Sequence, residues 1–192
     1  GDDAAIARTL HNLGFVAIAE AKLEEACAHL EPAIALRQAM GDTAGVAYSW
    51  WMLARALRLA GLPANARRRL DDALATFREV GDRMGEAFVM AELGRLALQE
   101  GDDGRALRCH RASLDMRLPL GDIQGAVDCL EGLAAVACRK GLSDLGVRLA
   151  ASAATWRVVR QAPLPGPFRA ELDAELALGR RALGDAGYED VW

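Results

Sequence analysis

The sequence predicts an all-α fold, a solenoid of antiparallel helix pairs with a capping helix at its C-terminal end. A Gly-Asp pair recurs every 40 residues, starting at residues 1, 41, 81 and 121. A second break lies near the middle of each 40-residue unit, at Ala21, Gly61, Gly101 and Gly141. Glycine suits the left-handed position that ends a helix, and aspartate caps the start of the next helix. Each unit is therefore predicted to form two helices joined by a tight turn.

Four such units are expected, at residues 1–40, 41–80, 81–120 and 121–160. Within a unit, the first helix is predicted at about positions 3–19 and the second at about positions 22–39. Position 13 is leucine in every unit, and positions 14, 26 and 33 are always small. Small side chains let two helix backbones approach closely, and the leucine fills the space beside them. These columns predict how the two helices of a pair pack together.

The repeat pattern ends near residue 160. Residues 161–192 begin with the proline-rich stretch QAPLPGP, which cannot continue a helix. The following FRAELDAELALGRRALG has the spacing of an amphipathic helix that ends at Gly184, and YEDVW resembles the start of another helix. The end of a solenoid has to be covered, so this segment is predicted to be a cap.

Composition and charge exclude several classes of protein. The formal net charge is −4, so we expect no direct binding of nucleic acid. The longest apolar runs are far too short to span a membrane, and the first residues do not resemble a signal peptide. Because the four cysteines lack CxxC spacing, they are predicted to be reduced, buried thiols of a cytoplasmic protein. The chain lacks an initiator Met, and we expect it to be a fragment of a longer protein.

The repeat columns resemble those of the tetratricopeptide repeat. In the third unit the matching residues are Met90, Leu93-Gly94, Ala106, His110 and Ser113. The period of 40 residues is longer than the usual 34, as in the long-repeat members of that family. His110 and Ala150 stand where the family has a large apolar residue. The resemblance covers about residues 1–160 and implies a right-handed superhelix, and it fits the Leu-small and Ala columns better than a HEAT-type solenoid.

A second resemblance concerns the tail. Residues 149–192 carry an aromatic residue in an Ala-rich helix, an APLP turn, a helix rich in acidic residues and arginine, and a final segment from Tyr188 to Trp192. This combination resembles the end of the repeat region in bacterial LuxR-type and related ATPase-containing transcriptional regulators. The resemblance implies a larger bacterial signalling or regulatory parent protein, and it assigns no chemistry to these residues.

An enzyme is not expected. The chain has no GxxxxGK[ST], GxSxG or HExxH motif, and we predict no catalytic residue, no cofactor and no metal site. The adjacent Cys109 and His110 point in different directions on a helix, so core or interface packing is favoured over metal binding.

The first helix of each pair is predicted to line a concave groove. The resemblance assigns the groove to positions 8, 11, 15, 18 and 19, and steps of three and four residues form one stripe along a helix. The candidate partner-binding residues are Arg8, His11, Phe15, Tyr48, Trp51, Arg55, Arg58, Phe88, Arg95, Gln99, Asp128, Glu131 and Arg139. Aromatic residues beside arginine are frequent anchors of protein interfaces.

Two neighbouring tryptophans fall on different faces of this pattern. Trp50 lies at position 10 and is predicted to pack between helices, whereas Trp51 lies at position 11 and is predicted to face the groove. Against this stands the possibility that a neighbouring helix covers Trp51 and that the arginines are simply solvated.

Two functions remain open from the sequence. The first is a protein–protein interaction module that binds a protein, a peptide or another domain of the parent chain in its groove. The alternative is a sensor whose groove takes a small effector and controls the ATPase or DNA-binding activity of the parent. A closed pocket around Trp51 would favour the sensor, and an open groove would favour protein docking.

Overall fold

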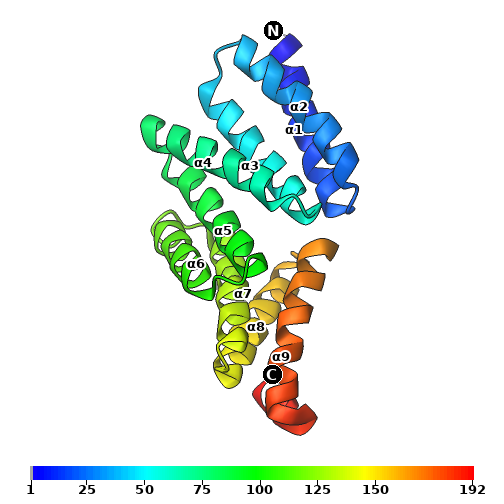
Figure 1. Ribbon diagram of the computed structural model, residues 1–192, viewed down its shortest axis with the longest axis vertical. Coiled ribbons are helices and arrows are strands. Elements are labelled where there is room, and N and C mark those ends of the chain that lie inside the picture. Colours follow the sequence, from blue (N-terminus) through cyan, green and yellow to red (C-terminus); the bar gives the residue numbers. More distant parts are fainter. Residues whose placement is uncertain (1) are drawn as a thin grey trace. The chain divides into compact units, whose positions relative to one another are not determined.

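A computed structural model describes residues 2–192, and these residues form helices and short connections without any strand. Figure 1 shows the helices in chain order. They are α1 (Asp2–Ala19), α2 (Leu23–Ala39), α3 (Thr43–Leu59), α4 (Pro63–Val80), α5 (Arg83–Gln99), α6 (Asp103–Arg117), α7 (Ile123–Arg139), α8 (Ser143–Arg160) and α9 (Gly166–Val191). The all-helical prediction is confirmed, and the helix starts of α3, α5 and α7 follow the 40-residue period.

The glycine-aspartate steps act as stop and start signals. Gly41 has a left-handed φ of +69°, and the Asp42 side chain accepts a hydrogen bond of 2.9 Å from the Gly45 amide. The later steps at residues 81 and 121 repeat this geometry. Left-handed φ also occurs at the middle break of each unit, including Ala21 with a φ of +59°. The predicted turn chemistry is therefore correct at these steps, while Gly1 lies outside the described residues.

Contacts between Cα atoms divide the chain after Glu92 into two compact units. In the first unit, α1 packs on α2, α2 on α3, and α3 on α4. The small residues at position 26 are fully buried, and the leucine at position 30 fills the space against the small residue at position 14. A Cβ atom on Gly14 would stand 2.6 Å from Leu30 Cγ, so this close approach requires glycine.

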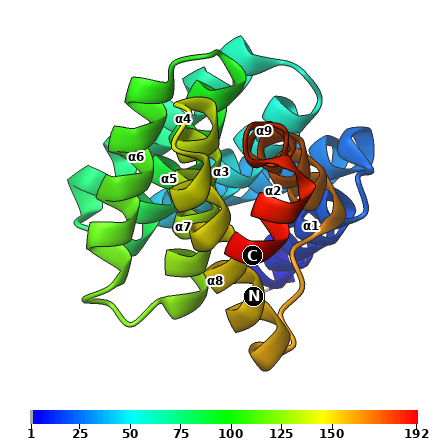
Figure 2. The ribbon, with the colours of Figure 1, turned by 90° about the horizontal axis from the view of Figure 1, so that it is seen from below.

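The second unit has the same arrangement around a histidine. Helices α6 and α7 lie side by side, as Figure 2 also shows, and α7 packs on α8. His110 of α6 is fully buried, where other units have an aliphatic side chain. Its imidazole occupies the space that glycine leaves on both flanking helices, Gly94 on α5 and Gly132 on α7. An aromatic ring is thus accommodated because two side chains are missing opposite it.

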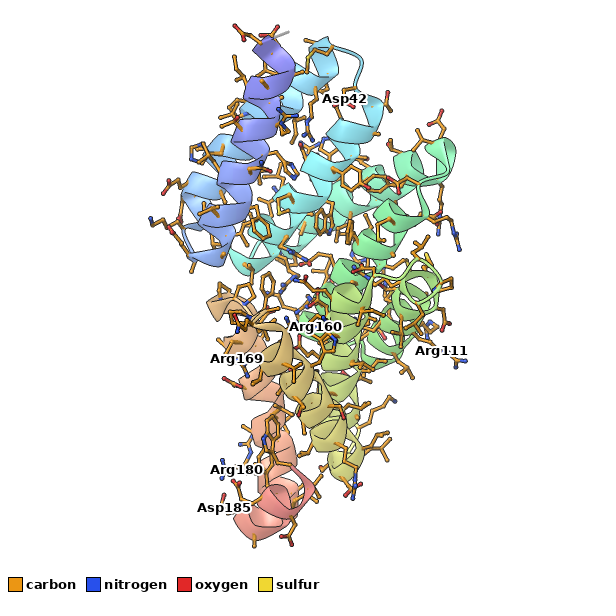
Figure 3. All side chains as sticks on the ribbon, turned by 180° about the vertical axis from the view of Figure 1, so that it is seen from behind. Asp42, Arg111, Arg160, Arg169, Arg180 and Asp185 are labelled. Carbon is orange, nitrogen blue, oxygen red and sulfur yellow. The ribbon has the colours of Figure 1, made fainter. Side chains whose placement is uncertain are left out.

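The C-terminal segment covers α7 and α8, as predicted for a cap. Helix α9 contacts both of them, and its side chains Phe168, Leu172 and Leu176 are buried. At Gly184 the backbone leaves the helical region with φ +71° and ψ 165°, so the helix ends there and a second short helix follows, as the sequence predicted. Figure 3 labels Arg180 and Asp185, which form an ion pair of 2.7 Å across this kink.

The leucine column behaves differently at the first helix. Leu53 and Leu93 are buried, but Leu13 is 44% exposed, so the prediction that position 13 is always a packing residue is wrong for Leu13. Helix α3 buries this face because it packs on α1 and α2. Among residues 2–192, no helix packs on the corresponding face of α1.

The four cysteines carry free thiols, and the prediction that they are buried is confirmed for three of them and wrong for Cys27. Cys109, Cys129 and Cys138 are buried, whereas Cys27 is partly exposed. Burial is the largest cause that raises the pKa of the Cys129 thiol, which disfavours its reactive thiolate form.

Candidate functional site

The two neighbouring tryptophans of α3 do not lie as predicted. Trp51 is only 8% exposed, whereas Trp50 is partly exposed. The Trp51 ring stacks on Phe88 of α5 at a centroid distance of 4.8 Å, and the Arg55 guanidinium lies 4.8 Å above the same ring. Trp51 does lie at the interface between first helices of successive pairs, but that interface is filled by the chain itself. The prediction of an open aromatic anchor at Trp51 is therefore wrong.

Trp50 packs less tightly than a core residue. It borders a shallow hollow together with Arg37 of α2 and Thr76 of α4, and its indole Nε1 is buried without a hydrogen-bond partner. Position 10 thus lies between helices, as predicted, but it is not sealed from solvent.

Tyr48 extends the aromatic cluster of the first unit. Its ring meets Phe77 at 4.7 Å and Phe88 at 6.3 Å, both edge to face. Its hydroxyl donates a hydrogen bond of 2.7 Å to Asp82. Burial, and then this carboxylate, raise the pKa of Tyr48 above its ordinary value, so the hydroxyl remains a donor at neutral pH.

The predicted arginines of α3 bind within the chain. Arg58 is buried and donates a hydrogen bond of 2.6 Å to Glu92, and Arg55 donates to the other oxygen of Glu92 at 3.1 Å. Glu92 is fully buried, so its charge needs these two guanidinium groups. The prediction that Arg55 and Arg58 wait for the carboxylates of a partner is corrected: a buried glutamate that the sequence analysis did not single out holds both.

Two of the three predicted partner-binding residues on α1 are accessible to solvent. Arg8 is exposed, and Phe15 is 50% exposed. His11 is half-buried, and its Nδ1 lies 3.3 Å from the Ser49 hydroxyl, to which Arg37 also donates at 2.9 Å. Burial, and then the nearby Arg37, lower the pKa of His11 to about 4, so its imidazole is neutral at pH 7.

The acidic end of the predicted stripe is also occupied. Arg157 of α8 donates to Asp128 at 2.6 Å and to both oxygens of Glu131 at 2.6 and 2.9 Å. Arg139 donates to Asp103 at 2.7 Å and to Glu175 of α9 at 3.1 Å. The expectation that Asp128, Glu131 and Arg139 are open to a ligand is therefore wrong.

One signal for these pairs was present in the sequence. Position 37 is arginine in three of the four units, as Arg37, Arg117 and Arg157, and Phe77 in the other. Arg37 and Arg117 pair with carboxylates that directly precede a first helix, at Asp42 and Asp122. Arg157 pairs with Glu131 in the middle of α7. Glu92 and Phe168 had no comparable signal, because neither belongs to a repeated column.

A cavity of about 240 Å³ lies in the second unit, between the end of α5, the middle of α7 and the start of α9. It contains three of the predicted groove residues, Arg95, Gln99 and Glu131. The Arg95 guanidinium lies 4.9 Å above the Phe168 ring, and Gln99 is exposed. The remaining lining residues are Leu98, Gly132, Ala135, Leu164, Phe168, Glu171, Leu172, Ala174 and Glu175.

Other kinds of site are not found in the described part of the chain. No group of three or more His, Cys, Asp or Glu side chains is placed to hold a metal ion among residues 2–192. None of the described helices combines the length and apolar character needed to cross a bilayer.

The pairs of antiparallel helices, their left-handed glycine breaks and the small-residue columns define a helical-repeat scaffold. The sequence profile of the tetratricopeptide repeat matches residues 5–79 and, in a second overlapping match, residues 45–118. The chain therefore belongs to the tetratricopeptide repeat family, whose fold is a non-catalytic scaffold that generally mediates protein–protein interaction.

Solved structures agree with this fold. A crystal structure of the putative kinesin light chain of Podosopora anserina, with nearly identical TPR-like repeats, aligns with a TM-score of 0.66 over 98% of this chain and 92% of that one, at 17% identity. A variant form of the same protein aligns with a TM-score of 0.67 over 100% of this chain and 92% of that one, also at 17% identity. No curated protein sequence matches the chain. At this identity the likeness concerns the fold alone.

Proposed function

We propose that the chain is the protein–protein interaction module of a larger bacterial signalling or transcriptional regulator that acts in the cytoplasm. The observation that carries this proposal is the open apolar face of α1. Ile6, Leu13 and Val16 lie on one side of the helix and are 47%, 44% and 49% exposed. Large apolar side chains gathered on one exposed face are typical of protein-binding surfaces. The docking surface is therefore this face, which we call the α1 face, rather than the filled interface around Trp51.

The repeat indicates what fits the α1 face. Its counterparts on α3 are Val46, Leu53 and Ala56, all buried where α3 packs on the first helix pair. A helix from a preceding pair is thus the shape that this surface accepts elsewhere in the chain. An amphipathic helix of the partner is the corresponding occupant of the α1 face.

Polar groups beside the α1 face specify the partner further. Arg37 of α2 donates to the Gly45 carbonyl oxygen and to the Ser49 hydroxyl, both on α3. Its guanidinium also lies 3.8 Å from the carboxylate of Asp42, which directly precedes α3. The counterparts on α1, one repeat earlier, are the exposed residues Asp2, Ala5 and Thr9. A partner helix that carries an arginine at the place of Arg37 would find the same kinds of acceptor on α1, at Asp2, Ala5 and Thr9.

The test starts from a photo-crosslinking amino acid placed at residue 13 in the full-length parent protein, in the cells that produce it. We expect one partner to be crosslinked through an amphipathic helix that contains arginine. Binding of this purified helix should weaken at least tenfold for Leu13→Asp and for Asp2→Arg. Val158→Asp is the matched control, because Val158 is also an exposed apolar residue, on α8, but lies outside the α1 face.

Two outcomes would overturn the proposal. One is a crosslinked partner whose contact segment is not helical. The other is a helix whose affinity falls equally for the α1 variants and for Val158→Asp. Circular dichroism of each variant separates a loss of binding from a loss of folding.

A sensor for a small effector is the second candidate function, and the cavity in the second unit favours it. Trp51 is only 8% exposed and lines neither this cavity nor the hollow beside Trp50, so the site for an effector would not be where the sequence suggested. The cavity that contains Arg95, Gln99 and Glu131 is partly enclosed by the capping helix α9. Ligand binding there would change how α9 packs on α7, and this could be transmitted to the ATPase or DNA-binding activity of the parent.

A further inference from the structure

The cavity of the second unit is lined by one arginine, Arg95. The Nε atom of Arg95 is buried and has no hydrogen-bond partner. The Phe168 ring holds its guanidinium in place at 4.9 Å. Half-buried arginine is normally paired, because the loss of hydration has to be offset by an acceptor. Arg95 is therefore the feature of this cavity that remains to be explained.

Two of the cavity's carboxylates already have cationic partners. Glu131 is held by Arg157, and Glu175 is held by Arg139 through Oε1, while its Oε2 is buried without a hydrogen-bond partner. The third carboxylate, Glu171, is partly exposed and also interacts with another group of the protein. The buried hydrogen-bond donor that the wall of the cavity leaves without an acceptor is thus the Nε of Arg95.

The rest of the wall is apolar and small. Leu98, Leu164 and Leu172 form the sides, and Gly132 and Ala135 of α7 form the floor. At about 30 Å³ per water-sized group, a volume of about 240 Å³ holds a ligand of about eight to ten non-hydrogen atoms. Such a ligand would bury its apolar part against the leucines.

We infer that this cavity binds a carboxylate carried on a short apolar or aromatic group, with Arg95 as the residue that receives the carboxylate. The inference rests on the second candidate function, the small-effector sensor, and names its ligand class. A free carboxylic acid and the C-terminal carboxylate of a peptide that ends in an apolar residue share this chemistry. Arginine suits both, because its planar fork binds a carboxylate through two parallel hydrogen bonds.

The probes are phenylacetate and its neutral amide, phenylacetamide, which have nearly the same size and shape. We expect phenylacetate to raise the melting temperature of the chain in a concentration-dependent way, and to bind at least tenfold more tightly than the amide in calorimetry. Arg95→Gln should remove this preference, so that acid and amide bind alike. Arg111→Gln is the matched control, because Arg111 is an exposed arginine on α6, labelled in Figure 3.

A second variant tests the location independently of charge. Ala135→Met fills the floor of the cavity and should weaken binding of phenylacetate at least tenfold while the helical content is kept. The source of the carboxylate is decided by a peptide ending in Phe, compared with the same peptide amidated at its C-terminus. Tighter binding of the peptide acid than of phenylacetate identifies a chain terminus as the ligand, and the reverse identifies a free acid.

The results separate this inference from both candidate functions. Equal affinity of wild type for acid and amide, or unchanged acid binding by Arg95→Gln, overturns the carboxylate assignment. Binding of the cation phenethylamine in place of the acid would also overturn the carboxylate assignment, but it would leave the sensor function standing. Absence of binding by all of these probes at 10 mM, roughly the weak limit for ligands of this size, overturns the inference and the sensor together. Partner binding through the α1 face is measured separately with Leu13→Asp, which should bind phenylacetate as the wild type does.

Discussion

Substitution of Gly132 by alanine tests the packing of the second unit most directly. A Cβ atom at this position would lie less than 3.0 Å from the buried imidazole of His110, which has no free space because Gly94 borders it on the other side. Overpacking of this kind costs about 1 to 3 kcal/mol. Alanine gains about 0.5 to 1 kcal/mol over glycine inside a helix. The net loss in the free energy of unfolding is then between zero and about 2.5 kcal/mol.

The assay is thermal and chemical unfolding followed by circular dichroism. For a chain of this length, about 2 to 4 °C corresponds to 1 kcal/mol, so the melting temperature should fall by up to about 10 °C. Gly104→Ala is the control, because that residue also lies in a helix but its nearest atom would be 3.5 Å away, an ordinary contact. The control should be as stable as the wild type or slightly more stable.

The same reasoning can be refuted in a double-mutant cycle. In a His110→Ala background the imidazole is gone, and Gly132→Ala should become neutral or stabilising. If Gly132→Ala lowers the stability of both backgrounds equally, or if it stabilises the wild type as Gly104→Ala does, His110 does not fill the space that these glycines leave.

Three further predictions concern the turns, the buried charges and pH. Ala21→Gly should raise the free energy of unfolding by about 1 kcal/mol, because alanine is held at a left-handed φ there, and Gly61→Ala should lower it by about 1 kcal/mol. Urea titration measures both changes. Equal stability of the two variants would contradict the turn assignment. Arg157→Met should lower the free energy of unfolding by about 3 to 5 kcal/mol, because Glu131 remains buried without its counter-charge. A change below about 1 kcal/mol in the same titration would show that the stability does not depend on this ion pair. For His11, whose folded pKa of about 4 lies below its unfolded value of 6.5, the neutral imidazole contributes stability that is present above pH 6.5 and is lost as the pH falls toward 4. His11→Gln should therefore flatten the melting temperature between these pH values relative to wild type, and parallel curves would refute the assignment.

The fold could be predicted because its signals are local. A glycine with positive φ and an aspartate that caps the next helix act within a few residues, as at Gly41 and Asp42, and neither depends on distant packing. The repetition of these signals then places the helix pairs. Even the end of the first part of α9 followed from one residue, Gly184.

The candidate site could not be predicted in the same way. Helical periodicity places Trp51, Arg55 and Arg58 on one side of α3, but it does not say whether that side is already occupied. The occupancy comes from Phe88 and Glu92 of another helix, and Glu92 has no equivalent in the other units. The exposure of Leu13 likewise depends on which helix packs beside it, and its column, the most regular in the sequence, does not reveal this.

The kink at Gly184 gives the last residues of the chain a different kind of attachment from the rest of the cap. Phe168 and Leu172 anchor the start of α9 by burial, which added salt does not weaken. Beyond the kink, Asp185 and Glu189 hold to Arg180 through water-accessible ion pairs at 2.7 and 2.9 Å, whose attraction falls as mobile ions gather around them. Ionic strength therefore sets how firmly the terminal turn is held, while the buried side chains that anchor the start of the cap are not weakened by it.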